Sequence, residues 1–175
     1  MVEVSISRIG FDAGTETFVV ILKEKEGERV LAIWIGRAEA ESIVMRIHNI
    51  THARPLTHDL CCNLIVGLGA TLQRVQITHV ENSTYFAELH LDLGGTVKVI
   101  DARPSDSIAV ALRMDAPILA ADDLLSDPDE EAERGDTVES APQASGGGEG
   151  TRLSADELKA YLEKLRPEDF GDFTL

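Results

Sequence analysis

One pattern of apolar residues occurs twice along the chain, and this duplication limits the possible folds more than any other feature. Residues 2–10 alternate apolar and polar side chains, which is typical of a half-buried strand. Two β-rich runs follow at 17–23 and 29–35, joined by a turn at residues 26–28, and these predict a hairpin. After Gly36 the apolar residues recur at three- and four-residue spacing, which predicts a helix.

The same order of elements then begins again. The second half predicts strands over 72–80, 84–91 and 96–100, followed by a helix from Pro104 to about Met114. A shift of 65 positions sets residues 35–43 beside residues 100–108, so the last strand and the helix start of both halves stay in phase. The sequence therefore predicts an internal duplication of a β-β-β-α unit.

Two such halves bury their sheets best by sharing a core, which predicts an α+β fold with a largely antiparallel sheet and helices packed on it. A further helix is expected from His58 to about Val66. We expect this domain to span residues 1–126. Residues 127–152 are acidic and Gly-rich with few large apolar side chains, which predicts a flexible linker. Residues 153–175 begin with a capping box and carry a helical apolar stripe, which predicts a C-terminal amphipathic helix and tail.

The net charge of −15 would ordinarily disfavour nucleic acid as a partner, but the charge is unevenly distributed. Residues 1–119 hold 11 basic and 15 acidic side chains, whereas residues 120–175 hold 5 and 16. The acidity thus belongs mostly to the tail. No apolar stretch is long enough to span a bilayer, the first residues do not resemble a secretory signal, and the two adjacent cysteines fit reduced thiols. A cytoplasmic protein is expected.

The densest polar cluster runs from Arg54 to Asp59, at the start of the second predicted helix. Free N–H groups at a helix start favour anions, and the guanidinium of Arg54 suits a phosphate. In a catalytic interpretation His58 transfers a proton, and Asp59 either orients the imidazole of His58 or binds a metal. In the alternative, Thr57 caps the helix, Asp59 interacts with the helix dipole and His58 is merely a surface residue.

A second cluster lies where a strand runs into the helix at Pro104. Asp101 and Asp106 can converge on a divalent cation, magnesium or manganese, with Arg103 facing a phosphate. Glu41 occupies the matching place in the first half and is a further candidate metal ligand, facing Asp106 across a pseudo-twofold axis. Equally, Pro104 and Asp106 suit a first helical turn, and an Arg103–Asp101 ion pair would tie the strand to the helix without catalysis.

Common nucleotide-binding, hydrolase and thioredoxin motifs are absent: the sequence has no Gly-rich phosphate loop, no G-x-S-x-G and no CxxC. Only 5% of the residues are aromatic. Trp34 is therefore expected in the core rather than as a base-stacking platform.

Three ordered motifs resemble those of the bifunctional nuclease domain family, and the resemblance covers residues 2–126. The motifs are Ile33-Trp34-Ile35-Gly36 with Glu39-Ala40, Arg54-Pro55-Leu56-Thr57-His58-Asp59, and Asp101-Ala102-Arg103-Pro104-Ser105-Asp106-Ser107-Ile108-Ala109. The chain departs from the family in His48, His52 and the acidic tail. The resemblance implies an α+β domain that self-associates, with a dimer favoured, in a family named for cleaving RNA and DNA in its plant members.

This resemblance leads to the hypothesis of a phosphodiesterase acting on RNA and DNA with little sequence preference. Arg54 and Arg103 would bind substrate phosphates and His58 would transfer a proton. Asp59, Asp101 and Asp106 would position a cation or water. The alternative is a non-catalytic regulatory module of the same fold that binds a small anion or a protein, with both motifs serving as helix starts.

Overall fold

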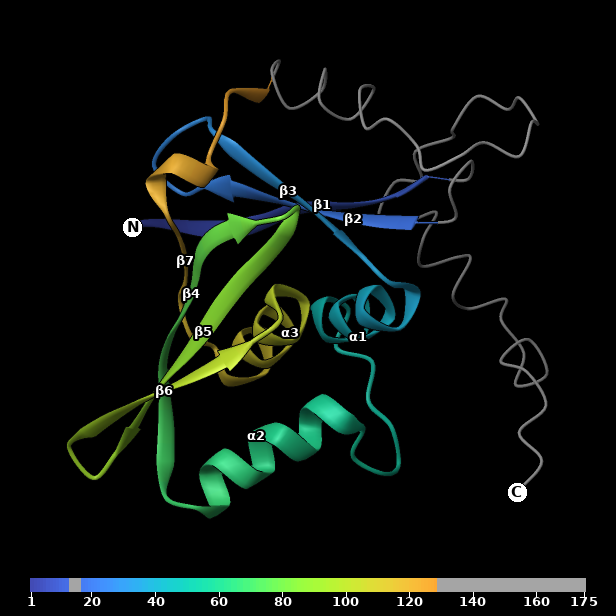
Figure 1. The fold of residues 1–175 in the computed structure, drawn as a ribbon. Helices are drawn as coiled ribbons and strands as arrows, with labels where there is room; N and C mark the ends of the chain where they lie inside the picture. The colour runs from blue at the N-terminus through green and yellow to red at the C-terminus, as the bar shows by residue number, and fades with distance from the viewer. Residues whose placement is uncertain (13–16, 129–175) are drawn as a thin grey trace.

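A single seven-stranded sheet organises the chain (Figure 1). The structure, a computed structural model, describes residues 1–12 and 17–128. The strands follow the order β3-β2-β1-β7-β4-β5-β6. Their bounds are β1 Val2–Asp12, β2 Thr17–Glu24, β3 Val30–Ile35, β4 Ala70–Glu81, β5 Thr84–Leu93, β6 Thr96–Ala102 and β7 Ile118–Ala120. Neighbouring strands are antiparallel except β4 and β7, which are parallel.

The two predicted units form the two wings of this sheet, and the predicted α+β fold is confirmed. Strands β1 to β3 form one antiparallel three-stranded wing, and β4 to β6 form the other. The short strand β7 joins them, pairing with β1 on one side and β4 on the other. The sequence did not predict β7, because a strand of three residues shows too little alternation to be recognised.

Three helices lie together on one side of the sheet (Figure 1): α1 Arg37–Ile47, α2 Thr57–Gly67 and α3 Pro104–Met114. Helix α3 begins with a proline at its first position and ends where Asp115 adopts a left-handed conformation. Its inner face is buried against α1, β4 and β5, and a 3₁₀ turn at Asp122–Leu124 follows β7. The core between helices and sheet is mostly aliphatic, with Leu22, Ile43, Ile77 and Ile108 fully buried beside Phe18.

Two local expectations differ from the structure. Helix α2 begins at Thr57 itself, with Leu56 in the capping position, because Asp59 accepts a hydrogen bond from the Leu56 N–H at 2.9 Å. Trp34, expected in the core, is 44% exposed. Its neighbours Ile33 and Ile35 are buried, so strand alternation places Trp34 on the opposite side.

The predicted C-terminal helix and nearly all of the predicted linker lie outside the described residues. Among the residues that are described, no helix has the length and apolar character needed to cross a membrane.

Candidate functional site

The two β-β-β-α units bring two strand-to-helix junctions into contact. Gly36 links β3 to α1, and Arg103 links β6 to α3; each is the N-cap of its helix in an extended conformation. A side chain at Gly36 would clash with the carboxylate of Glu39, so glycine leaves room for that carboxylate at the helix start. The N-terminal turns of α1 and α3, which carry the first and third sequence motifs, therefore form one side of the candidate site.

Arg103 holds these two helix starts together. Its guanidinium binds Asp106 through two hydrogen bonds, Nε–Oδ2 at 2.7 Å and Nη2–Oδ1 at 3.1 Å. Its remaining nitrogen, Nη1, lies 2.9 Å from Oε1 of Glu39 on α1. The side chain of Arg103 is still 65% exposed, so its outer edge is open to a ligand. The predicted ion pair between Arg103 and Asp101 is thus replaced by pairs with Asp106 and Glu39.

His58 from the second motif joins the same cluster. Its Nε2 lies 3.0 Å from Oδ1 of Asp106, and its Nδ1 lies 2.7 Å from the hydroxyl of Ser42 on α1. An ionised Asp106 can only accept, so Nε2 carries the proton and Nδ1 accepts from the Ser42 hydroxyl. A hydrogen-bonded chain therefore runs from Ser42 through His58 and Asp106 to Arg103, and it connects all three helices.

Hydrogen bonds determine the charges of Asp106 and Arg103 in this cluster. Burial alone would raise the pKa of Asp106, but hydrogen bonds from Arg103 and His58 outweigh burial and lower the pKa below its ordinary 3.8. The same pairing with Asp106 raises the pKa of Arg103. Asp106 is consequently a carboxylate and Arg103 a cation near neutral pH. The imidazole of His58 is thus held between Asp106 and Ser42, in the way an aspartate orients a catalytic histidine.

A pocket of about 250 Å³ lies beside this cluster. Its walls come from the end of β3, the turn between β4 and β5, and the start of α3. Trp34, Tyr85 and Arg103 line it together with Glu39 and Ser105. The pocket thus combines two aromatic side chains with the exposed guanidinium of Arg103.

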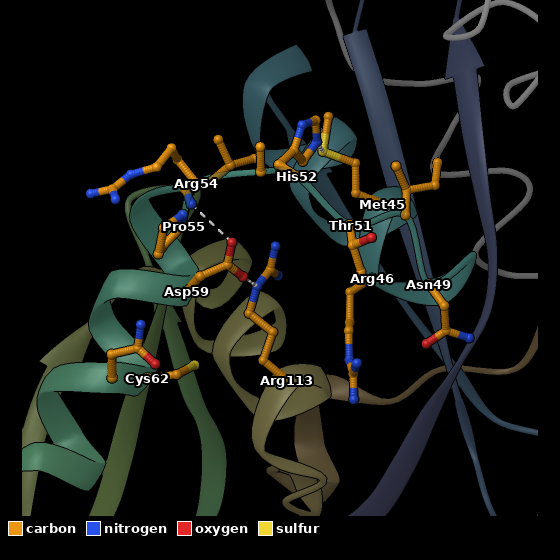
Figure 2. Close-up of a pocket in the computed structure, with 14 residues that line it drawn as sticks. Met45, Arg46, Asn49, Thr51, His52, Arg54, Pro55, Asp59, Cys62 and Arg113 are labelled. Carbon is orange, nitrogen blue, oxygen red and sulfur yellow. Dashed lines mark hydrogen bonds and ion pairs between the residues drawn. The ribbon is translucent and has the colours of Figure 1, made fainter.

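A larger cavity, of about 520 Å³, lies on the other side of the second motif (Figure 2). Arg54, Asp59 and Arg113 are among the residues that line it. Arg113 Nε donates to Oδ1 of Asp59 at 2.7 Å, and its Nη1 donates to the backbone carbonyls of Ser42 and Ala109 at 3.3 and 3.0 Å. Figure 2 shows the exposed side chain of Arg54 extending away from this pair.

The pair of Asp59 and Arg113 has a structural role. The hydrogen bond from Arg113 and the one from the backbone N–H of Leu56 lower the pKa of Asp59 below its ordinary 3.8. Asp59 is therefore an ionised cap that ties α2 to α3. Cys62 lines the same cavity, and burial raises the pKa of its thiol, which makes it a poor nucleophile at neutral pH.

The remaining predicted metal ligands, Asp101 and Glu41, have other neighbours. Asp101 is exposed on β6, where it is paired in register with Glu88 of β5. Glu41 forms an ion pair with Arg37 at 2.8 Å. The described residues contain no group of three or more His, Cys, Asp or Glu side chains arranged to hold a metal ion.

Sequence reasoning missed three residues of this region: Ser42, Glu39 as the partner of Arg103, and Arg113. The 65-residue shift of the repeat sets Ser42 beside Ser107, and this serine shared by both halves could have pointed to Ser42 as a residue of the site. Glu39 was passed over for Glu41, two positions on, because the sequence does not fix which carboxylate of a helix start reaches the neighbouring helix. Arg113 lies ten residues from Arg103 and belongs to none of the three motifs.

Comparison with known proteins identifies the same family that the three sequence motifs resemble. A family model described as the bifunctional nuclease domain matches residues 20–133. An uncharacterized protein of Mycobacterium tuberculosis is 34% identical over 175 residues, a match that covers 97% of this chain and 98% of that protein. The similarity therefore extends beyond the domain into the acidic C-terminal region.

Plant proteins are more distant relatives. Bifunctional nuclease 2 and Bifunctional nuclease 1 of Arabidopsis thaliana are 28% and 27% identical over 103 residues. Each match covers 57% of this chain and about a third of the plant protein, 31% and 32% respectively.

Proposed function

The chain belongs to the bifunctional nuclease domain family, and from this premise we propose that it is a nuclease that hydrolyses phosphodiester bonds of RNA and DNA with little sequence preference. The names of the plant relatives support the reaction class. The observation that carries the proposal is that His58 of the second motif contacts Asp106 of the third, 48 residues away, beside a pocket that contains an exposed arginine.

In the proposed reaction Arg103 binds the substrate phosphate at its exposed edge. The phosphate displaces the carboxylate of Glu39 from Nη1, while Asp106 continues to hold the guanidinium through its two other hydrogen bonds. The N-terminal turns of α1 and α3 lie beside the phosphate and add favourable partial charge.

His58 is the proposed proton carrier. A water molecule attacks phosphorus, the bond to the leaving oxygen breaks, and the proton released by the water passes through the Ser42 hydroxyl to Nδ1 of His58. Asp106 stabilises the imidazolium formed in this step, because its carboxylate already accepts from Nε2. The imidazolium then returns a proton to the leaving oxygen, which restores the resting state.

The predicted magnesium or manganese ion remains a proposal without an assigned step. Arg103 and His58 already occupy both carboxylate oxygens of Asp106, and Arg37 occupies Glu41. A cation here would have to compete with these arginines, so the proposed chemistry uses side chains alone. Cleavage that survives in excess EDTA would support this route, and cleavage that EDTA abolishes would support the cation.

Assays with short labelled single-stranded RNA and DNA test the proposal. We expect the purified protein to cleave both, and His58→Ala and Asp106→Ala to lower kcat by at least about 100-fold, as loss of a general acid–base does. Circular dichroism must show that both variants remain folded. Activity that survives both substitutions, or that separates from the protein during purification, would contradict the assignment.

A second candidate function rests on the same contacts. Most charged groups of the three motifs are paired within the fold, including Asp59 with Arg113 and Glu39 with Arg103. This pairing favours a non-catalytic module that binds an anion or a protein partner. Binding of RNA without any cleavage by the wild-type protein would select this candidate.

Self-association is also part of the proposal. Helix α2 buries none of its residues fully although Leu60, Leu64 and Val66 are apolar, and the edge strand β6 exposes Val97 and Val99. Such surfaces are covered in many proteins by a second copy. We therefore expect a homodimer, and we expect Val99→Lys to shift it toward monomer in light scattering. We also place the protein in the reducing cytoplasm, where the free thiols of Cys61 and Cys62 persist.

A further inference from the structure

Trp34 occupies an unusual position for the only tryptophan of the chain. It lies on the edge strand β3, paired in register with Val19 of β2, and 44% of its surface is exposed. An exposed tryptophan forgoes much of the free energy that its burial would supply, on the order of 25 cal/mol per Å². A large aromatic ring at the surface is therefore a candidate contact for a ligand.

The surroundings of Trp34 define which ligand chemistry fits. The pocket of about 250 Å³ beside it is slightly smaller than the roughly 300–1,000 Å³ of drug-sized ligand sites, so it suits one nucleotide unit rather than a duplex. Tyr85 contributes a second aromatic side chain, and Arg103 contributes the exposed cation. These three residues come from three separate segments of the chain, which the fold brings to one place.

A nucleotide has one group that fits the aromatic side chains of this pocket and another that fits its arginine. Its base has a flat face that stacks on an aromatic ring whatever the sequence, and its phosphate pairs with a guanidinium. In a duplex the bases are stacked on each other and are not available to a protein ring. We propose that Trp34 stacks a base of a single-stranded nucleic acid whose adjoining phosphate binds Arg103, an inference that rests on the proposed nuclease function and names its substrate class.

This placement also explains the low sequence preference that the proposed function requires. Stacking on Trp34 reads no hydrogen-bonding edge of the base, and Arg103 contacts only the backbone. Single-stranded RNA and DNA would both fit, because neither contact involves the sugar.

The fluorescence of Trp34 gives a direct test that does not depend on catalysis. Since the chain has one tryptophan, any change in emission reports on this residue alone. The full-length protein is titrated at low salt with a single-stranded oligonucleotide, with an abasic strand of the same length, and with the corresponding duplex. We expect saturable quenching by the single strand and little quenching by the other two.

Three results overturn the inference. Emission unchanged by the single strand shows that no base reaches Trp34. Equal quenching by the abasic strand shows that the phosphates act alone. Emission that depends on protein concentration, and not on the oligonucleotide, shows that Trp34 contacts a second copy of the chain.

Variants at the same position provide the functional arm. Base stacking contributes about 1–3 kcal/mol, so Trp34→Leu is expected to raise KM for single-stranded RNA by about 5- to 150-fold with kcat little changed. Trp34→Phe keeps an aromatic face and is expected to restore most of the affinity. Ile47→Ala at the end of α1, where the native side chain is 43% exposed and lies outside the pocket lining, serves as the control for loss of exposed apolar surface.

The fluorescence titration and the kinetics of the Trp34 variants together distinguish failure of this inference from failure of the proposed function. Quenching by the single strand without any cleavage would retain the stacking role and reject the nuclease assignment. Cleavage with an unchanged KM in Trp34→Leu would retain the nuclease and reject the stacking role.

Discussion

His58 and Asp59 are neighbours in the chain, yet they belong to two regions with different roles. His58 faces the cluster of Ser42, Asp106 and Arg103, next to the pocket that contains Trp34. Asp59 faces the larger cavity, where it binds Arg113 and the N–H of Leu56. One motif at a helix start thus serves two sides of α2.

The comparison favours the smaller pocket as the proposed substrate site, although it is not the larger of the two. The larger cavity contains more arginines. Arg113 is nearly buried and bound to three acceptors, and Arg46 donates to the carbonyl of Leu112. Arg54 is exposed but has no tryptophan, tyrosine or phenylalanine among the residues that line this cavity with it. The smaller pocket offers an arginine that is mostly exposed and an aromatic ring that is half exposed. Groups already committed to the fold stabilise it, whereas exposed groups of matched chemistry can bind a substrate.

The largest expected effect is on stability, in the larger cavity. Arg113→Met removes hydrogen bonds to Asp59 and to two backbone carbonyls, each worth about 1 kcal/mol. We expect the free energy of unfolding to fall by about 3 kcal/mol in urea denaturation, while kcat/KM of the folded fraction changes less than about threefold. A loss of activity larger than the loss of folded protein would place catalysis in this cavity.

The next effect separates two exposed arginines of the sequence motifs. Arg103→Met is expected to raise KM for single-stranded RNA by about 10- to 100-fold, since charge-assisted hydrogen bonds contribute about 1.5–3 kcal/mol. The matched variant Arg54→Met is expected to change KM less than about twofold, because Arg54 lines the other cavity and extends away from Asp59 and Arg113 in Figure 2. Steady-state kinetics at fixed ionic strength measure both, and the reverse ranking would exchange the roles of the two regions.

A smaller effect of opposite sign is expected at Glu39. Glu39 Oε1 lies 2.9 Å from Nη1 of Arg103, so in the proposed reaction this carboxylate competes with the substrate phosphate. Glu39→Gln removes the competing charge and is expected to lower KM by about 2- to 5-fold, a range typical of partly exposed charge pairs. An increase in KM would show that Glu39 positions Arg103 instead of competing for it.

The smallest effect appears only in acid. The folded-state pKa of Asp59 is lowered, so its ion pair with Arg113 stabilises the fold above the unfolded value of about 3.8 and loses this contribution as the pH falls through the folded value. Asp59→Asn is therefore expected to flatten the decline in melting temperature below about pH 4. Thermal melts of both proteins from pH 7 to pH 3 check this, and parallel curves would contradict it.

Local patterns in the sequence were sufficient for most of the fold. Alternation predicted the strands of both wings, and the stripe from Ala40 to Ile47 predicted α1. The three-residue strand β7 was not predictable in this way, because it shows too little alternation. Alternation within β3 places Trp34 opposite to Ile33 and Ile35, but the sequence does not show that this face of an edge strand stays exposed.

The candidate site was predictable in its motifs and not in its contacts. Residue types at helix starts drew attention to His58, Arg103 and Asp106, and the structure brings these three together. Asp101 was grouped with them by sequence proximity, but it lies on β6 before the chain turns into α3. Ser42 lies within α1, and only the packing of α1 against α2 and α3 gives its hydroxyl a role.

A crystal structure of the His58→Ala protein soaked with a non-hydrolysable single-stranded dinucleotide would show where the substrate binds. We expect the phosphate within hydrogen-bond distance of Arg103, beside the first turns of α1 and α3, and one base against Trp34. A dinucleotide bound instead in the cavity of Arg54, Asp59 and Arg113, with the pocket of Trp34 empty, would contradict this placement.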